Sequence, residues 1–170
     1  MSEARTQLRL AVGEVPGIHF NGLVRRLDLA PGQAQHHLRR LVSDGEVERL
    51  AIYGRTHYFQ PGTDPSRRRR IAVCHRETAR ELLVYLLEAG RSDPASAAEA
   101  LGVARSTLEW HLGHLVEQDL VEKRRDGRGR VELVPARPAE TVRLLRAIEP
   151  SLPDRLVDRF TRLIDHLLAE

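Results

Sequence analysis

The chain has 170 residues, 41% hydrophobic but only 4% aromatic, which allows one ordinary domain or two small ones built around aliphatic side chains. A formal net charge of +3 and a pI near 9.6 permit a polyanionic partner without requiring one. The lone cysteine, Cys74, excludes an intrachain disulfide framework and a Cys-x-x-Cys metal knuckle. No apolar stretch approaches the ~18 residues that a membrane span needs.

The first part of the chain predicts three helices followed by a β-hairpin. An amphipathic helix over residues 3–12 precedes a short helix at FNGLVRRL, residues 20–27. Pro31 suits the first position of a third helix, which stops at Gly45. The stretches VERLAIY and RTHYF then predict two strands that turn at Gly54. Three helices and a hairpin describe a winged helix, in which the hairpin is the wing.

The second part of the chain predicts the same order of elements. RETARELLVYLLEAG is helical, Pro94 opens a short helix, and a third helix covers about residues 105–118. VEKRR and RVELV form a hairpin around residues 126–129. Two further helical patterns follow Pro138.

The two parts are copies of one short unit. Residues 27–48 align with residues 101–122 at a constant offset of 74, and eight aligned positions are identical. These pairs are Leu27/Leu101, Ala30/Ala104, His37/His111, Leu38/Leu112, Leu41/Leu115, Val42/Val116, Val47/Val121 and Glu48/Glu122. Most of them are apolar and at helical spacing, so the repeated feature is a core pattern.

The adjacent histidines of the first copy face different ways. His37 falls within the apolar stripe of its helix, as His111 does in the second copy, which favours packed histidines bonded to the backbone. His36 lies on the outer face. Because adjacent helical residues diverge by about 100°, these two rings do not chelate one metal ion together, and we expect no metal or cofactor.

Polar side chains on the outer faces of the two third helices are the candidate DNA-reading residues. Glutamine can read adenine, and arginine can read guanine or hold a phosphate, although a solvated polar face has the same composition. The candidates are Gln33, Gln35, His36, Arg39 and Arg40 in the first copy and Arg105, Ser106 and Thr107 in the second.

Basic side chains of the wings and the connecting segment are the candidate phosphate contacts. In the first wing these are Arg49, Arg55 and His57, and in the second they are Lys123, Arg124, Arg125, Arg128 and Arg130. Four consecutive arginines join the two copies: Arg67, Arg68, Arg69 and Arg70. They either keep a linker soluble or lie along phosphates, each contact adding a salt-dependent term.

Two apolar features predict protein contacts. Trp110 takes the place of His36 in the second copy, and an outward tryptophan flanked by carboxylates favours a partner or interdomain contact. Near the end of the chain, a heptad-like seam predicts either packing on its own domain or pairing with a second copy of the chain. We predict the pairing, and therefore a dimer. The seam consists of Leu152, Leu156, Phe160, Leu163 and Leu167.

These motifs resemble a known family. LAPGQAQHHLRRLVSDGEV with its Gly-tipped hairpin resembles the ArsR/MarR-like winged-helix transcription regulators, and LGVARSTLEWHLGHLVEQDLVEKRRDGRGRV resembles them more closely. Two such domains in a short chain look like the tandem regulators of archaea, haloarchaea especially. The resemblance covers about residues 3–134 and implies dimeric, cytoplasmic DNA binding with the third helix in the major groove. Ala30 and Ala104 stand where the family often has a capping serine, and the lone cysteine means that metal sensing is not carried over.

We therefore predict a mostly α protein with small β-wings (α+β). Its predicted parts are an N-terminal winged helix-turn-helix domain (1–62), a basic linker (63–70), a second such domain (71–135) and a C-terminal helical dimerisation segment (136–170). The N-terminal stretch MSEARTQLRLAVGEV lacks the features of a signal peptide, so we expect a cytoplasmic protein.

The function predicted from the sequence is sequence-specific regulation of transcription on double-stranded DNA, with any effector ligand unknown. The main alternative is a winged-helix interaction module of the kind associated with condensin or polymerase, which Trp110 and the seam would suit. Catalysis is not expected, because the sequence has no Gly-rich phosphate loop, no Gly-x-Ser-x-Gly elbow and no His-Glu-x-x-His motif.

Overall fold

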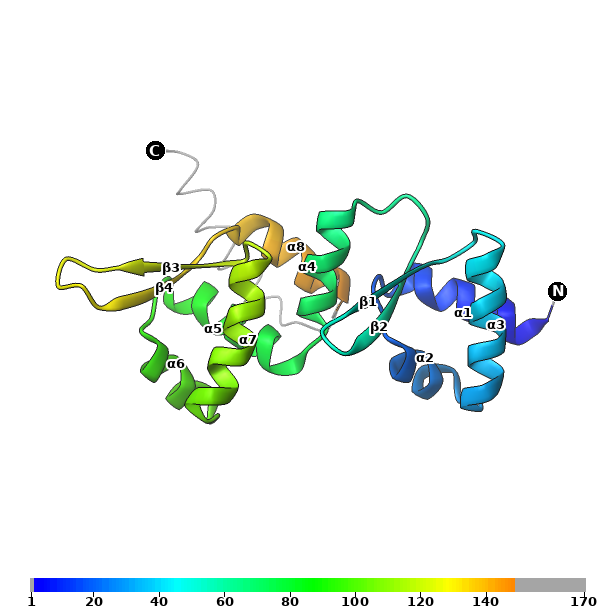
Figure 1. Ribbon diagram of the computed structural model, residues 1–170, viewed down its shortest axis with the longest axis horizontal. Coiled ribbons are helices and arrows are strands. Elements are labelled where there is room, and N and C mark those ends of the chain that lie inside the picture. Colours follow the sequence, from blue (N-terminus) through cyan, green and yellow to red (C-terminus); the bar gives the residue numbers. More distant parts are fainter. Residues whose placement is uncertain (1, 149–170) are drawn as a thin grey trace. The chain divides into compact units, whose positions relative to one another are not determined.

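The computed structural model describes residues 2–148, which divide into two compact units with the boundary between His75 and Arg76 (Figure 1). Within the described residues the chain has eight helices and two antiparallel two-stranded sheets, an arrangement consistent with a winged helix-turn-helix protein. None of the described helices is long and apolar enough to cross a membrane. The seam from Leu152 to Leu167 lies outside the described residues, so the dimer stays a prediction.

The first unit has three helices, a hairpin and a fourth helix. Its elements are α1 (Glu3–Glu14), α2 (Phe20–Leu27), α3 (Pro31–Ser43), β1 (Glu48–Ile52), β2 (Arg55–Phe59) and α4 (Pro65–Cys74). The two strands pair antiparallel, with Glu48 opposite Phe59 and Ile52 opposite Arg55. Gly54 turns the hairpin at a φ of 77°, a left-handed conformation that favours glycine. The predicted helices and hairpin therefore lie close to where the sequence placed them.

The core of the first unit is aliphatic. Leu8 and Val12 of α1 pack with Leu23 of α2 and with Leu38 and Leu41 of α3, and all five are essentially inaccessible to solvent. Burying such a side chain stabilises a fold by roughly 1.5–3 kcal/mol, so this cluster holds the helices together. The same packing leaves the opposite face of α3 in solvent.

The basic segment at 63–70 was predicted as a linker whose arginines could already be helical. It is helical from Pro65 onward and belongs to the first unit. Pro65 occupies the first turn of α4, and the Asp64 carboxylate accepts a hydrogen bond from the backbone N–H of Arg67 at 3.0 Å. At the other end of α4, Ile71 and Cys74 are buried. Capping and burial together explain why the arginine run continues as a helix rather than as an extended joint.

The second unit begins with the same order of elements as the first. Its elements are α5 (Glu77–Ala89), α6 (Pro94–Leu101), α7 (Arg105–Glu117), β3 (Val121–Arg125), β4 (Val131–Pro135) and α8 (Pro138–Ile148). The first three helices of the two units begin 74 residues apart in each case. Leu82, Leu108 and Leu112 form part of the buried interior, in keeping with a repeated core pattern. Figure 1 shows the β3–β4 hairpin extending well beyond the helices of its unit.

Each hairpin gains a short third partner that the sequence did not reveal. In the first unit His19 forms an isolated antiparallel bridge with His57, and in the second Ser92 forms one with Leu133. The amide of Leu133 donates to the carbonyl of Ser92 at 2.7 Å. These bridges tie the segment before the second helix of each unit to its wing.

Candidate nucleic-acid interface

The outer face of α3 carries the polar residues predicted to read DNA. Pro31 starts the helix, and Ala30 at its N-cap makes no side-chain capping bond. A buried stripe that includes Ala34, Leu38 and Leu41 turns the opposite face outward. All five predicted residues on that face are exposed: Gln33, Gln35, His36, Arg39 and Arg40. Neither arginine forms an ion pair with another described residue, so both guanidinium groups are available to an anionic partner.

Part of this face meets the first wing in a groove. Two adjoining hollows of about 390 and 310 Å³ share Gln35, Arg49 and Tyr58 as lining residues. The larger one is also lined by Arg55 and the smaller by Arg39. We call these two hollows together the wing groove. It brings Gln35 and Arg39 of α3 together with Arg49 and Arg55 of the hairpin, whereas Gln33, His36 and Arg40 do not line it.

The pKa of Tyr58, which lines the wing groove, is affected by the positive charges around it. Burial raises the pKa of its phenol, and the nearby guanidinium groups of Arg49 and Arg39 oppose that rise by favouring the phenolate. Arg39 and Arg49 belong to different elements, yet both act on one hydroxyl group. The helix and the wing therefore present their positive charges to the same place.

Residues at the start of α2 also line the wing groove and were not predicted. They are His19, Phe20 and Asn21, joined by Thr56 from β2. The sequence signal was the start of the short helix itself, because backbone N–H groups at a helix N-terminus attract anions. Asn21 and Thr56 add neutral hydrogen-bonding groups to the four predicted side chains.

His57, predicted to reach DNA from the first wing, does not do so, because its side chain is only 1% exposed. Its Nδ1 lies 2.7 Å from the carbonyl oxygen of Gly17, so Nδ1 carries the proton and donates to that oxygen. Strand β2 is covered at this point by the segment that bridges to His57 through His19. His57 is therefore a core residue of the first unit.

His57 belongs to a cluster of three histidine rings. The centroids of His19, His57 and His75 lie 5.9–6.5 Å apart, and His75 Nε2 lies 2.8 Å from the carbonyl oxygen of Pro16. The sequence placed these residues in three separate segments and indicated no relation among them. Over residues 2–148, no three His, Cys, Asp or Glu side chains are grouped so that they could hold a metal ion. The three rings lie where β2, the end of α4 and the start of α2 meet.

The four arginines of α4 are not equivalent. Arg67 is exposed at the start of the helix, whereas Arg68 forms an ion pair with Glu48 and donates to the carbonyl of Thr63 at 2.8 Å. Arg69 and Arg70 are half-buried, and Arg69 lies 3.4 Å from the hydroxyl of Ser66. Of this run, Arg67 is the residue best placed for a phosphate.

The outer face of α7 differs in charge from that of α3. Arg105, Ser106 and Thr107 are exposed at its start, as predicted residues of a DNA-reading face. However, the Glu109 carboxylate, at the position equivalent to Gln35, accepts from Arg105 at 3.2 Å and from Lys123 at 3.3 Å. These contacts partly neutralise one cation of the helix and one of the wing.

Trp110 is the largest exposed apolar side chain of the second unit, at 47% exposure. The Arg76 guanidinium carbon lies 4.8 Å from the centroid of its ring, a cation–π contact, and the His114 ring meets it edge-on at 4.3 Å. Desolvation lowers the pKa of His114, the neighbouring positive charge of Arg76 lowers it further, and Glu117 opposes both. Trp110 is thus packed against two neighbouring side chains while nearly half of it stays exposed, which suits a contact with another macromolecule.

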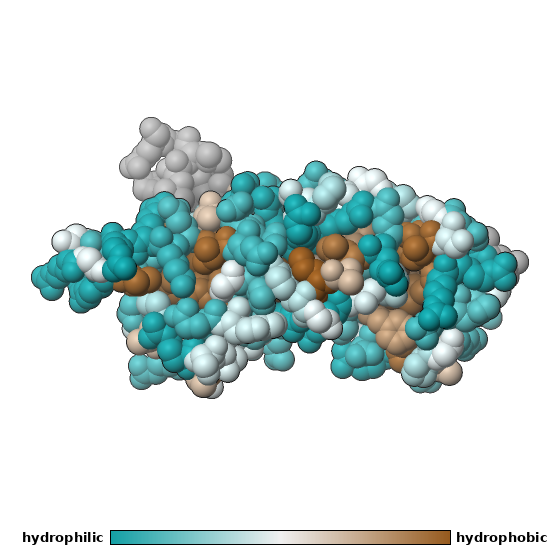
Figure 2. All heavy atoms as spheres, in the orientation of Figure 1, coloured by the Kyte–Doolittle hydropathy of each residue, from teal (hydrophilic) through white to brown (hydrophobic). Residues whose placement is uncertain are grey.

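The second wing is strongly basic, but its own carboxylates and carbonyls bind much of that charge. Arg124 pairs with Glu122 at 2.9 Å, and Arg130 pairs with Asp126 at 3.1 Å. Arg125 donates to the carbonyl of Gly129 at 2.7 Å. Figure 2 shows the outer end of the hairpin as a hydrophilic surface. The exposed Arg128 side chain at the tip makes no ion pair with another described residue.

The turn of the second wing is held by Asp126. Its carboxylate accepts from the backbone N–H groups of Arg130 and Arg128, at 2.9 and 2.8 Å, and these bonds lower the pKa of the carboxyl group. Gly129 follows at a φ of 79°. These bonds fix the conformation of the turn, in which the Arg128 side chain is exposed.

Comparison with known proteins identifies the first unit. Residues 2–71 match a family model described as HTH_HVO_0163_N, N-terminal HTH domain. The first unit is a helix-turn-helix domain. The match suggests that this part of the chain binds DNA. Its third helix is α3. No curated protein matches the chain.

Among solved structures, the chain is similar to the crystal structure of ScpB from Mycobacterium tuberculosis. The identity is 12%, the alignment covers 84% of this chain and 94% of that chain, and the TM-score is 0.34.

Proposed function

We propose that this protein is a sequence-specific, DNA-binding transcription regulator made of two winged helix-turn-helix domains, of the ArsR/MarR-like tandem type of archaea. It acts in the cytoplasm, binds double-stranded DNA as a dimer and catalyses no reaction. The observation that carries the proposal is the wing groove, where Gln35, Arg39, Arg49 and Arg55 meet in the unit that matches a helix-turn-helix family.

The chemistry of these four side chains divides the work of binding. When α3 enters the major groove, Gln35 can pair with an adenine edge and Arg39 with a guanine edge. Arg49 and Arg55 then hold the phosphates beside the helix, which sets the register without reading sequence. The exposed His36 and Arg40 extend the contact along α3.

The second domain contributes mainly through its wing. Arg128 at the tip of this hairpin holds a phosphate, and Arg67 at the start of α4 does so from the first unit. Each adds a salt-dependent, sequence-independent term to affinity. The paired state of Arg105 and Lys123 with Glu109 argues against base reading by α7.

Fluorescence anisotropy with a duplex from the protein's own upstream region and with a scrambled duplex, at several salt concentrations, tests the proposal. We expect a steep salt slope and a clear preference for the native duplex. Arg39→Ala should weaken binding to that duplex about tenfold or more and relax the preference. Arg9→Ala removes the same charge from α1 of the same domain, outside the wing groove, and should change affinity less than about twofold. Equal effects of the two substitutions would contradict the assignment of α3.

The second candidate is a protein-binding module, and the observation that favours it is Trp110 with its stacked Arg76. An exposed tryptophan held between cationic and imidazole groups has the character of an interface hot spot. In this reading the outer face of α7 docks on a protein while the first domain holds DNA.

Heparin chromatography separates the two candidates, because a purely protein-binding chain elutes at low salt. Trp110→Ala then tests the role of α7. We expect DNA affinity to stay within about twofold, because the tryptophan carries no charge for phosphates. Weaker DNA binding with an unchanged oligomeric state would show that Trp110 contacts DNA instead.

A further inference from the structure

Tyr58 of β2 is a buried tyrosine whose hydroxyl group has no partner in the part of the chain that the structure describes. The side chain is 7% exposed, and within residues 2–148 its hydroxyl group makes no hydrogen bond. The oxygen atom is not enclosed by protein, because Tyr58 lines both hollows of the wing groove. Since a buried phenol usually bonds to a neighbouring group, this open hydroxyl indicates a ligand in the groove.

The backbone of the first wing places the Tyr58 side chain beside Arg49. The two residues stand opposite each other in the β1–β2 hairpin. The amide of Tyr58 donates to the carbonyl of Ile18 at 3.1 Å, and its carbonyl accepts from the amide of Gly17 at 3.0 Å. Tyr58 and Arg49 are therefore a non-hydrogen-bonded pair of the hairpin, the kind in which facing side chains come closest. The phenol and the guanidinium group thus lie together on one face of the wing.

Arg39 adds a second positive charge from α3. It lines the smaller hollow together with Arg49 and Tyr58. Both guanidinium groups oppose the rise in the pKa of the Tyr58 phenol, so their charges act on the hydroxyl group itself. Neither arginine forms an ion pair with another described residue, and no Asp or Glu lines either hollow. Two unpaired cations and a hydroxyl donor suit an oxyanion with several acceptor oxygens, as a phosphate group has.

The second unit lacks this combination of groups. Leu133 takes the place of Tyr58, opposite Lys123 in its hairpin. Gly113 takes the place of Arg39. Leu133 is fully buried, which shows that a winged helix of this chain can fill the position without a hydroxyl group. The hydroxyl of Tyr58 is therefore not needed for packing.

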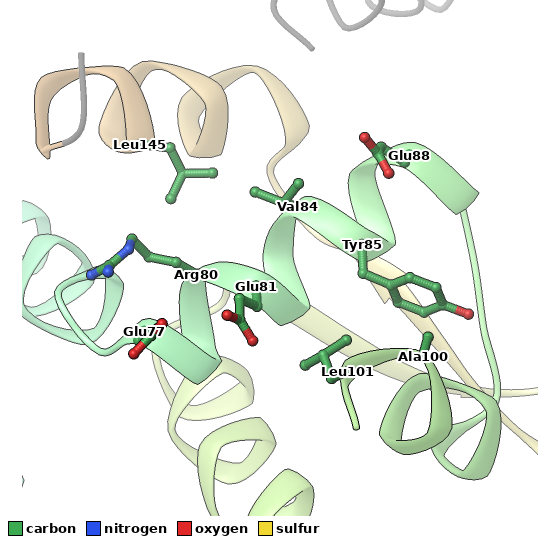
Figure 3. A pocket seen from close by; sticks show the side chains of 9 residues that line it. All are labelled: Glu77, Arg80, Glu81, Val84, Tyr85, Glu88, Ala100, Leu101 and Leu145. Atoms are coloured by element: carbon green, nitrogen blue, oxygen red, sulfur yellow. The ribbon is translucent and has the colours of Figure 1, made fainter. Parts of the chain in front are cut away.

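Tyr85, a tyrosine of the second unit, lines a hollow of the opposite charge. This hollow has a volume of about 630 Å³ and runs along α5 (Figure 3). The Tyr85 hydroxyl lies 3.0 Å from that of Ser92, so it already has a hydrogen-bond partner. The charged lining residues of the hollow are one arginine and three glutamates: Arg80, Glu77, Glu81 and Glu88. An anion is therefore favoured by the wing groove and not by this hollow.

We propose that Tyr58 and Arg49 bind a phosphate group in the wing groove, with Arg39 adding its positive charge from α3. The Tyr58 hydroxyl donates to one phosphate oxygen, and the Arg49 guanidinium donates to the others. The phosphate belongs to a DNA strand or to a free phosphate monoester, and only the first source rests on the proposed function. A free monoester in this place excludes the DNA strand, so the two ligands compete.

Tyr58→Phe tests the site, because it removes the hydroxyl group and keeps the buried ring. In phosphate-free buffer we expect about tenfold weaker binding of the upstream duplex by anisotropy and of phenyl phosphate by NMR titration, with an unchanged melting temperature. The salt slope of duplex binding should also stay the same, since tyrosine carries no charge. Arg49→Gln should instead lower that slope by about one.

Tyr85→Phe is the matched control, because it removes the same hydroxyl group from the second unit. It should lower the melting temperature, since the bond to Ser92 is lost, and leave both affinities within about twofold. A damaged fold therefore gives a different pattern from a damaged phosphate site.

A competition assay at constant ionic strength distinguishes the two sources of the phosphate. Displacement of the duplex by phenyl phosphate from the native protein, and not from Tyr58→Phe, would identify a site that a free monoester occupies. Weaker duplex binding by Tyr58→Phe, with no binding of phenyl phosphate, would identify the DNA strand as the source. Phenyl phosphate binding that depends on Tyr58, without duplex binding, would contradict the proposed function and support the site. If Tyr58→Phe weakens the binding of neither ligand, the proposal is wrong.

Discussion

The third helices of the two domains share their inner faces and differ in their outer ones. Leu38 in α3 and Leu112 in α7 are both buried at equivalent positions. On the outer faces Gln35 is matched by Glu109, His36 by Trp110 and Arg39 by Gly113. The inner residues hold each helix on its domain, whereas the outer ones contribute little to that packing. The chemistry of the surface can therefore diverge between two copies without loss of the fold.

Replacing the shared leucines tests the common part of the comparison and has the largest expected effect. Leu38→Ala and Leu112→Ala each leave a cavity in an aliphatic core, so each should lower the free energy of unfolding by about 2–5 kcal/mol. Chemical denaturation of the two variants checks this. A loss below about 1 kcal/mol in either variant would mean that the inner faces are not equivalent.

The first wing sharpens the comparison, because one of its predicted contacts is a core residue. His57→Ala removes a buried ring and its bond to Gly17, so we expect a loss of about 1–3 kcal/mol in stability with DNA affinity per folded molecule unchanged. Arg55→Ala in the same strand should leave stability unchanged and weaken DNA binding. Thermal melts paired with anisotropy titrations distinguish the two, and a selective loss of DNA affinity in His57→Ala would return this residue to the interface.

Exchanging the residue types at one equivalent position tests the outer faces directly. Gln35→Glu places a carboxylate in the wing groove and should weaken DNA binding about fivefold. Glu109→Gln releases Arg105 and Lys123 and should strengthen binding about twofold, with a steeper salt slope. Anisotropy titrations at several salt concentrations measure both. The comparison fails if the two substitutions shift affinity in the same direction.

The smallest effect is a pH dependence confined to the second domain. The pKa of His114 is lowered in the folded state, chiefly by desolvation, so the unfolded chain takes up this proton first as pH falls. The stabilising contribution is present above about pH 6.5, the ordinary pKa of histidine, and is lost as pH falls below it. Denaturant titrations at pH 7.5 and 5.5 should show a smaller difference in His114→Gln. An unchanged difference would mean that other groups cause the pH dependence.

Much of the fold was accessible from local sequence. The helix beginning at Phe20, the proline starts of α3 and α6, and the Gly-tipped first hairpin follow from spacing and capping within a few residues. The helical nature of the arginine run depended on the Asp64 cap and on burial of Ile71. The Asp64 cap is a local signal that the prediction did not use, whereas the burial of Ile71 is not a local property.

The candidate site was predicted only in part. Exposure of Gln35 and Arg39 follows from the apolar stripe of α3, but their meeting with Arg49 and Arg55 requires the wing to fold back beside that helix. Arg55 and His57 are two residues apart in β2, so the alternation of a strand places both on the same face. The sequence pattern therefore could not show that one is exposed and the other buried. A segment some forty residues earlier in the chain covers His57 and leaves Arg55 partly exposed.

The sequence by itself determined the helices, the hairpins and the inner leucines, because these depend on periodicity and on neighbours within a few residues. Only the tertiary structure decided which charges are available. Glu109 joins Lys123 across the α7–wing contact, and Arg68 joins Glu48, because packing brings together groups that lie far apart along the chain. The same packing buries His57 in the core and leaves Arg39 exposed to solvent. Burial depends on which surfaces meet in the folded chain and not on the residue type alone.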